Sequence, residues 1–198
     1  VDYVSAYIQS ALAQKARCIY ITGDLPTTEV LNQLEAVTKG LAKNEDLVIV
    51  DRCEIYSENG VFSPDKLVKN IKTLVQAALQ DGYDSLAITG ELSWLVDYAD
   101  AEELIMEYEW KLNEYVFDKY PISALCRYNI NKFSDQMIRN VIQTHPIILW
   151  KNKIHENPYY IPPQGFKADS AAKHQVKTWL ENIDRFTDKQ SRFENIFA

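Results

Sequence analysis

Glycine is scarce in this chain, and its scarcity removes a class of phosphate-binding sites. Only six glycines occur in 198 residues. Neither G-x-x-x-x-G-K-[ST] nor G-x-G-x-x-G is present, so no glycine-rich loop is expected to surround a phosphate with backbone N–H groups. The motifs G-x-S-x-G and H-E-x-x-H are also missing, which removes the usual signatures of a serine hydrolase and of a zinc protease.

Cysteine and histidine are too few and too dispersed to indicate a metal centre. The three cysteines, Cys18, Cys53 and Cys126, form no C-x-x-C pair, and the three histidines lie far apart. We therefore expect neither a disulfide framework nor a zinc site, and no cofactor. Reduced thiols are typical of intracellular proteins, so a cytoplasmic location is predicted.

Positive charge and long apolar runs are scarce as well. Lysine and arginine number 21 against 28 acidic residues, which gives a net charge of −7. No basic cluster is present, so direct nucleic-acid binding is not expected. The longest apolar runs are strand-sized and far shorter than the roughly 20 residues that span a bilayer, so no membrane insertion is expected. A start at Val1 instead of Met predicts a fragment excised from a longer protein.

Short apolar runs alternate with longer stretches of helical spacing, which is typical of an α/β fold. Because the strands are continuously apolar, as in LVIVD and SLAIT, we expect a mostly parallel sheet buried on both faces. The predicted strands are Cys18–Thr22, Leu47–Asp51, Ser85–Thr89, Ile122–Tyr128 and Ile147–Lys151.

The helix boundaries carry their own signals. Thr27 is the predicted N-cap of a helix over Thr28–Lys39 that ends at Gly40, and Ser63 precedes a proline at the first position of the next helix, which ends at Gly82. Asp100 and Glu103 have capping-box spacing for a third helix. A fourth is predicted from Ser134 to the residues before His145-Pro146.

The C-terminal part is expected to differ from the rest. Three prolines in Asn157–Pro163 predict an extended arm. Beyond it, residues 170–197 are predicted to form one polar helix with an apolar seam, either a dimerising signalling linker or a helix that packs back onto the domain. The seam comprises Val176, Trp179, Leu180, Ile183, Phe186, Phe193 and Phe197.

Two strand ends carry candidate functional side chains. Glu91 follows the strand Ser85–Thr89, at the edge where open α/β sheets bind ligands, and Trp94 stands three residues on. The alternative is that Glu91 caps a helix and Trp94 fills the core. At the next strand end, Cys126 and Tyr128 face one side of the sheet and Arg127 the other. Cys126 is either a soft wall of a cavity or an inert buried thiol.

In their order along the chain, these and other motifs resemble those of one family, MEDS, a sensory domain of methanogens and methylotrophs. The resemblance runs from about Cys18 to Phe166. It is carried by CIYI at 18–21, the turn Asp51…Tyr56, NGVFSPD at 59–65, TGELSW at 89–94, EYE at 107–109 with Leu112-Asn113, LCRY at 125–128, THP at 144–146 and ENPYYIPP at 156–163.

The resemblance implies a RecA-like three-layer α/β sandwich without a working phosphate loop. It implies a sensory domain over residues 1–168 and a C-terminal helix or signalling linker over 169–198. Family members usually open with a strand that bears a histidine, and this chain begins in the helix after it. A fragment without that strand is expected to expose an unpaired sheet edge.

The family occurs in sensor histidine kinases and transcriptional regulators, with a proposed role in sensing one-carbon or hydrocarbon-derived compounds. We therefore expect a non-enzymatic input domain, more in keeping with a histidine kinase, whose partners are a small ligand, an output domain and, through the C-terminal helix, a second copy. The expected ligand-binding residues are Glu91, Trp94, Glu109, Cys126, Tyr128 and His145. The alternatives are a degenerate RecA-like nucleotide-binding ATPase and a pure dimerisation scaffold. The sequence names neither the ligand nor the output domain.

Overall fold

The computed structural model describes residues 2–58, 61–98, 100–151, 153–163 and 175–185. The chain divides into two compact units, Val1–Asp135 and Gln136–Ala198. Within the described residues, no helix combines the length and the apolar character that crossing a membrane requires.

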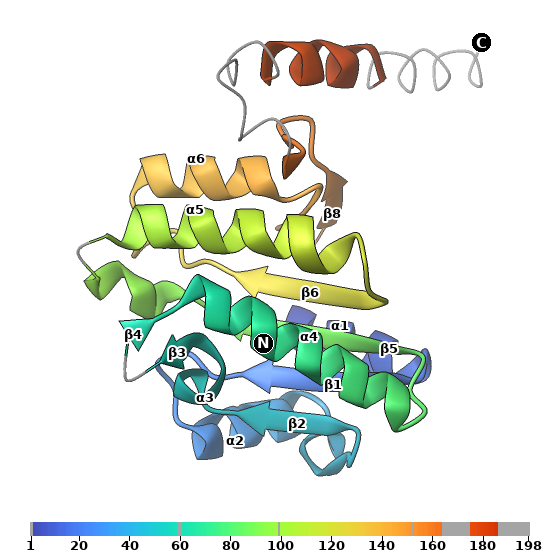
Figure 1. Ribbon diagram of the computed structural model, residues 1–198. Coiled ribbons are helices and arrows are strands. Elements are labelled where there is room, and N and C mark those ends of the chain that lie inside the picture. The colour runs from blue at the N-terminus through green and yellow to red at the C-terminus, as the bar shows by residue number, and fades with distance from the viewer. Residues whose placement is uncertain (1, 59–60, 99, 152, 164–174, 186–198) are drawn as a thin grey trace. The chain divides into compact units, whose positions relative to one another are not determined.

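The first unit is an α/β fold around four parallel strands, ordered β2-β1-β5-β6 (Figure 1). Its strands are β1 Ala16–Ile21, β2 Leu47–Val50, β5 Ser85–Glu91 and β6 Ile122–Arg127, with a small hairpin of β3 Ser57–Glu58 and β4 Val61–Phe62. Its helices are α1 Asp2–Ala13, α2 Thr27–Val37, α3 Arg52–Tyr56, α4 Pro64–Gln80 and α5 Ala101–Leu112, with shorter turns η1 Leu41–Lys43, η2 Ser93–Asp97 and η3 Asn113–Phe117.

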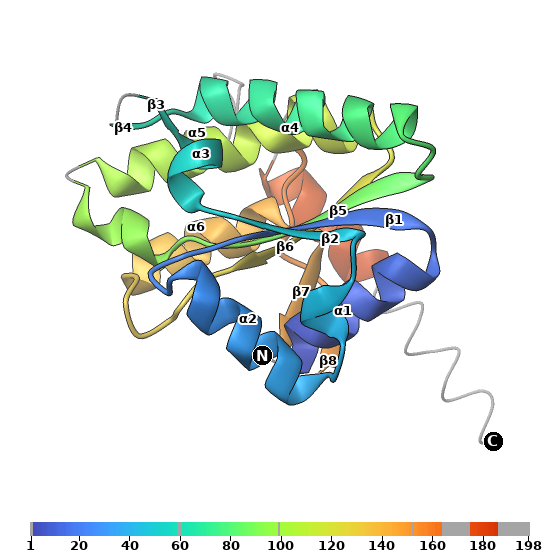
Figure 2. The same cartoon turned by 90° about the horizontal axis from the view of Figure 1, so that it is seen from below.

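Helices cover both faces of this sheet, α4 and α5 on one side and α1 and α2 on the other (Figure 2). The direction of the crossovers explains this. From β1 the chain moves outward to β2 through α2, and from β2 it returns past β1 to β5 through α4. Since parallel crossovers are right-handed, opposite directions of travel place the two helices on opposite faces. The predicted α/β class and parallel sheet are confirmed.

The apolar pattern of the strands and helices builds both cores. On the α1 and α2 face, Ile8 and Leu34 pack with Cys18 and Tyr20 of β1. On the other face, the buried residues of the two helices are Leu67, Val68, Ile71, Val75 and Ala78 of α4, and Ile105, Tyr108, Glu109 and Leu112 of α5. Strands β1 and β5 are buried on both faces, as their apolar runs predicted, whereas β2 is mostly half-buried and β6 has two exposed residues, Ser123 and Ala124.

Helix boundaries follow the sequence in part. Ser63 Oγ accepts a hydrogen bond from the Lys66 amide at 3.3 Å, and Gly82 follows α4 at φ +89°, both as predicted. The prediction for Thr27 was wrong: it is the first helical residue, because Pro26 holds the extended N-cap conformation and supplies no side-chain bond. Asp100 occupies the N-cap of α5, but its side chain makes no capping bond.

The second unit contains most of α6 Asp135–Thr144, then β7 Ile147–Trp150 and β8 Lys153–Glu156. The strand predicted at Ile147–Lys151 exists, but it pairs antiparallel with β8 in a separate two-stranded sheet, so its expected place in the parallel sheet is corrected. Strands β7 and β8 are joined by a tight turn, in which Lys151 takes the positive φ of 46° that such hairpins require.

The arm and the last helix complete this unit. Asn157 is buried, and its side-chain amide donates to the carbonyls of Ile142 and His145 at 2.6 and 2.7 Å, which ties the arm to the end of α6. Residues 175–185 are helical. The predicted seam residues Phe186, Phe193 and Phe197 lie outside the described residues.

Candidate functional site

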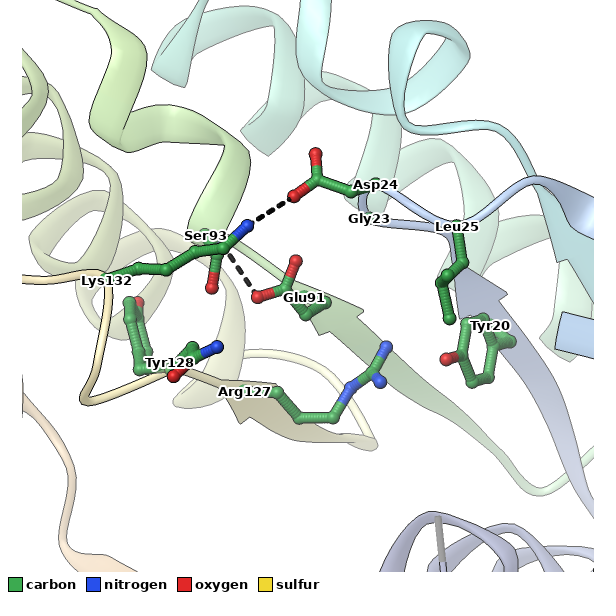
Figure 3. Close-up of a pocket in the computed structure, with 10 residues that line it drawn as sticks. Tyr20, Gly23, Asp24, Leu25, Glu91, Ser93, Arg127, Tyr128 and Lys132 are labelled. Carbon is green, nitrogen blue, oxygen red and sulfur yellow. Dashed lines mark hydrogen bonds and ion pairs between the residues drawn. The ribbon is translucent and has the colours of Figure 1, made fainter. Parts of the chain in front are cut away.

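A crevice opens at the carboxyl edge of the parallel sheet, between the ends of β1 and β5. From these two strands the chain leaves in opposite directions across the sheet, and such a switch point is where open α/β sheets bind ligands. A cavity of about 420 Å³ lies there, within the size range of small-molecule sites (Figure 3). Its lining is Tyr20, Gly23, Asp24, Leu25, Glu91, Ser93, Arg127, Tyr128, Asn129 and Lys132.

Arg127 is the most unusual side chain of this crevice. The register pairs it with Glu91 across β5 and β6, and its guanidinium carbon lies 4.6 Å from the centroid of the Tyr20 ring. In Figure 3 the side chain extends from β6 toward Tyr20. Its Nε and Nη2 atoms are buried and have no hydrogen-bond partner among the described residues.

Asp24 braces the mouth of the crevice. Its carboxylate receives Lys132 Nζ at 2.8 Å and Arg52 Nη1 at 2.7 Å. Hydrogen bonds from Lys132 and Arg52 hold the pKa of Asp24 below its usual value. One carboxylate therefore joins the loop after β1, the helix after β2 and the loop after β6.

Glu91 is held at the floor of the crevice by the backbone. Its Oε1 accepts the Ser93 amide at 2.9 Å, and its carbonyl accepts Trp94 Nε1 at 3.1 Å. Gly23 lies against it so closely that an added Cβ would collide with Glu91 Oε2. The carboxylate is therefore positioned by main chain on two sides.

Trp94 belongs to an aromatic cluster beneath this edge. It is 7% exposed, and its ring lies 5.6 Å from Tyr56 and 5.8 Å from Phe62. Tyr108 completes the group at 6.4 Å from Tyr56 and 6.1 Å from Phe62. The structure thus places Trp94 in the core between the β3–β4 hairpin, α3 and the sheet, and outside the lining of the crevice.

Glu109, Cys126 and Tyr128 come together on the α5 face of the sheet. Glu109 is 1% exposed and accepts a hydrogen bond from the Tyr128 hydroxyl. Cys126 Sγ lies 3.8 Å from the Tyr108 hydroxyl. Burial, with the charge of Glu109 second, raises the pKa of the Cys126 thiol, and the same two causes raise the pKa of Tyr128. The Cys126 thiol and the Tyr128 hydroxyl therefore stay protonated at neutral pH.

Tyr128 connects the crevice to this buried group. It lines the crevice and donates to Glu109, whereas Cys126 and Glu109 do not line it. Among the sequence-predicted residues, Glu91 and Tyr128 lie on the crevice wall, and Trp94, Glu109 and Cys126 lie behind it.

His145, the last of the sequence-predicted site residues, lies in the second unit. Its Nδ1 lies 2.8 Å from the Val141 carbonyl and 3.0 Å from Thr144 Oγ1. Because a carbonyl only accepts, Nδ1 carries the proton, and the ring closes the end of α6.

Sequence reasoning did not select Asp24, Arg127 and Lys132 as site residues. Asp24 follows β1 as Glu91 ends β5, so the strand-end rule applied to every strand would have selected it. Arg127 was placed on the opposite side of the sheet from Cys126, which the structure confirms, but its stacking on Tyr20 depends on the strand order.

Comparison with known proteins identifies the family. The sequence model of MEDS, the "MEthanogen/methylotroph, DcmR Sensory domain", matches residues 1–146. The chain belongs to the MEDS family. It is also similar to the transcriptional repressor DcmR of Methylorubrum extorquens, with 24% identity over 80 residues, or 40% of this chain. The matched part spans 30% of the length of that relative.

Proposed function

We propose that this MEDS chain is the ligand-sensing input domain of a prokaryotic signalling protein and binds a small organic compound in the crevice between β1 and β5. The observation that supports it is a cavity of about 420 Å³ at the switch point of the sheet, lined by charged and aromatic side chains. Glu91 and Tyr128 would contact the ligand. Trp94, Glu109 and Cys126 would hold the wall in place from behind.

The proposal treats the domain as non-enzymatic, with one-carbon or hydrocarbon-derived compounds as candidate ligands. Cys126 supports this, because its thiol has a raised pKa and is therefore a poor nucleophile at neutral pH. We extend it to a RecA-like fold without a working phosphate loop. The acidic end of β5 and the parallel sheet support that extension. The cytoplasmic location stays a prediction.

The output of the parent protein is a separate question. The sequence resemblance favoured a histidine kinase, whereas the curated relative is a transcriptional repressor, which supports a DNA-binding output. Ligand binding shifts either output only by its differential affinity for two conformations.

A second candidate function is dimerisation. In the helix of residues 175–185, Val176, Leu180 and Ile183 have helical spacing and are 52%, 57% and 58% exposed. Such a stripe favours a helix-to-helix contact with a second copy. Sedimentation of the chain at rising concentration tests it, and a constant monomer mass would contradict it.

The experiment for ligand sensing is a thermal-shift titration of the chain. The panel is methylamine, methanol, dichloromethane, methanethiol and MgATP, at constant ionic strength. A saturable rise in Tm with one organic compound supports the proposal, because selective binding stabilises the native state. A rise with MgATP alone would favour the degenerate ATPase, and no rise with any organic compound would contradict sensing of this class.

A further inference from the structure

We infer that the crevice recognises a small organic monocarboxylate, whose two oxygens bind the Nε and Nη2 edge of Arg127. The inference rests on the proposed function and specifies the chemical class of its ligand.

The guanidinium of Arg127 has a charged edge that lacks a hydrogen-bond acceptor among the described residues. An arginine stays protonated in proteins, and Nε–H and Nη2–H point in parallel along one edge of its plane. Both atoms are buried without an acceptor among the described residues, so a ligand reaches them when the Arg127 side chain shifts toward the crevice. The Tyr20 ring covers one face of the group at 4.6 Å, but a ring face supplies no acceptor in the plane of the fork. A buried charge left in this condition is costly, so such an edge calls for an acceptor.

The geometry of this edge selects the kind of acceptor that would bind it. Two parallel N–H donors match the two oxygens of a carboxylate, and such bidentate pairs are among the strong hydrogen bonds of proteins. The described residues supply no carboxylate for this role. Asp24 binds Lys132 and Arg52, and no ion pair joins Glu91 to Arg127 in the described part of the chain.

The charged side chains around the crevice determine which ligand charge is favoured. The lining contains two cations, Arg127 and Lys132, and two anions, Asp24 and Glu91. Arg52, just outside the lining, shares Asp24 with Lys132, so three cations stand against two anions and one positive charge is left for a ligand. A monoanion on Arg127 is therefore favoured, whereas the carboxylate of Glu91 disfavours a dianion such as phosphate or sulfate.

The structure also offers a matched control. Arg17 stacks on Tyr83 at 5.4 Å, as Arg127 stacks on Tyr20, but Arg17 Nη1 donates to the Glu45 carbonyl at 2.8 Å and to the Tyr83 hydroxyl at 2.9 Å. Arg17 lies at the opposite edge of the sheet, so Arg17→Gln removes an equivalent charge without touching the crevice.

The experiment titrates the wild-type chain with sodium formate, acetate and propionate, with acetamide as the neutral isostere and with phosphate and sulfate as dianions. Ionic strength is held constant with sodium chloride. Binding is followed by ¹H–¹⁵N spectra and by Tm. We expect saturable shifts at residues 90–93 and 127–129 with the carboxylates only. Arg127→Gln should weaken binding by about tenfold to a hundredfold, the loss of a charge-assisted hydrogen bond, and Arg17→Gln should leave it unchanged.

Several outcomes overturn the inference. Acetamide binding as tightly as acetate would show that charge plays no part, and tighter binding of phosphate or sulfate would remove the carboxylate class. Unchanged acetate affinity in Arg127→Gln, or spectral shifts away from the crevice, would remove the assigned contact. The wild-type spectra give this answer even if Arg127→Gln does not fold. A neutral one-carbon compound that binds wild type and Arg127→Gln alike would leave the sensing function standing and refute only the carboxylate.

Discussion

Two arginine–tyrosine stacks lie at opposite edges of the same parallel sheet, and they differ in what surrounds them. At the amino edge, Arg17 bonds to Glu45 and Tyr83, and Tyr83 donates in turn to Asp46 at 2.6 Å. At the carboxyl edge, Arg127 stacks on Tyr20 with two buried nitrogens unpaired in the described residues. The same pair of residue types thus has hydrogen-bond partners at one edge, whereas at the other edge two guanidinium nitrogens have none among the described residues.

The largest expected effect concerns the core beneath the carboxyl edge. Trp94→Ala should lower the free energy of unfolding by about 3–5 kcal/mol, because it removes a buried ring that packs on Tyr56 and Phe62. Chemical denaturation measures it. Trp150→Ala is the control, since Trp150 is 50% exposed and its loss should cost little. A Trp94→Ala chain that is as stable as wild type but binds ligand more weakly would contradict the core assignment and place Trp94 on the crevice wall.

The next effect belongs to the core near the amino edge. Burial raises the pKa of the Cys18 thiol to about 11, and Asp46 adds to the rise while Arg17 opposes it. The folded state therefore keeps this proton at a pH where the unfolded state loses it. The resulting stability is complete below about pH 9, the ordinary value, and is lost as the pH rises toward 11.

Two pKa units correspond to about 3 kcal/mol. Denaturation curves at rising pH measure this loss of stability. Cys18→Ala should flatten its alkaline part, and Cys53→Ala should not, because Cys53 is exposed. Equal slopes in wild type and Cys18→Ala would contradict the assignment.

The two arginines themselves should respond in different ways. Arg17→Met should destabilise the chain by about 1–2 kcal/mol, since it removes a charged donor from two acceptors. Arg127→Met should change the ligand-free stability by less than about 1 kcal/mol, because the lost stacking is offset by the removal of an unpaired buried charge. Urea denaturation of both variants makes the comparison. Equal destabilisation would show that Arg127 is as well satisfied as Arg17.

The smallest effect tests the backbone contact under Glu91. Gly23→Ala should push the Glu91 carboxylate aside, weaken its bond with the Ser93 amide and cost about 1 kcal/mol or slightly more. Gly40→Ala should cost a similar amount for a different reason, its φ of +85°. Only Gly23→Ala should alter ligand affinity, and thermal-shift titration of both variants would reveal an equal effect as a contradiction.

The sequence predicted the strands well because continuous apolar runs such as LVIV are local signals. It also placed the candidate site at the carboxyl edge of the sheet, because the position of Glu91 just after an apolar run is a local signal as well. It did not predict which side chains share the crevice, because Tyr20 and Arg127 meet only when β1, β5 and β6 are placed in order. The antiparallel pairing of β7 was missed because an apolar run gives no direction for its partner. Trp94 was ambiguous in sequence, since a strand-end aromatic residue suits either a rim or a core.

Asp24 makes the rim of the crevice more dependent on ionic strength than the buried cores of the same unit. Its two cations are partly exposed, so dissolved salt screens their attraction, whereas the aromatic cluster around Tyr56 is closed to ions. At high salt the two loops and the helix that meet at Asp24 lose their common tether, while the sheet and its cores persist. The ionic strength of the surroundings would thus set how firmly the entrance to the crevice is held, independently of any ligand.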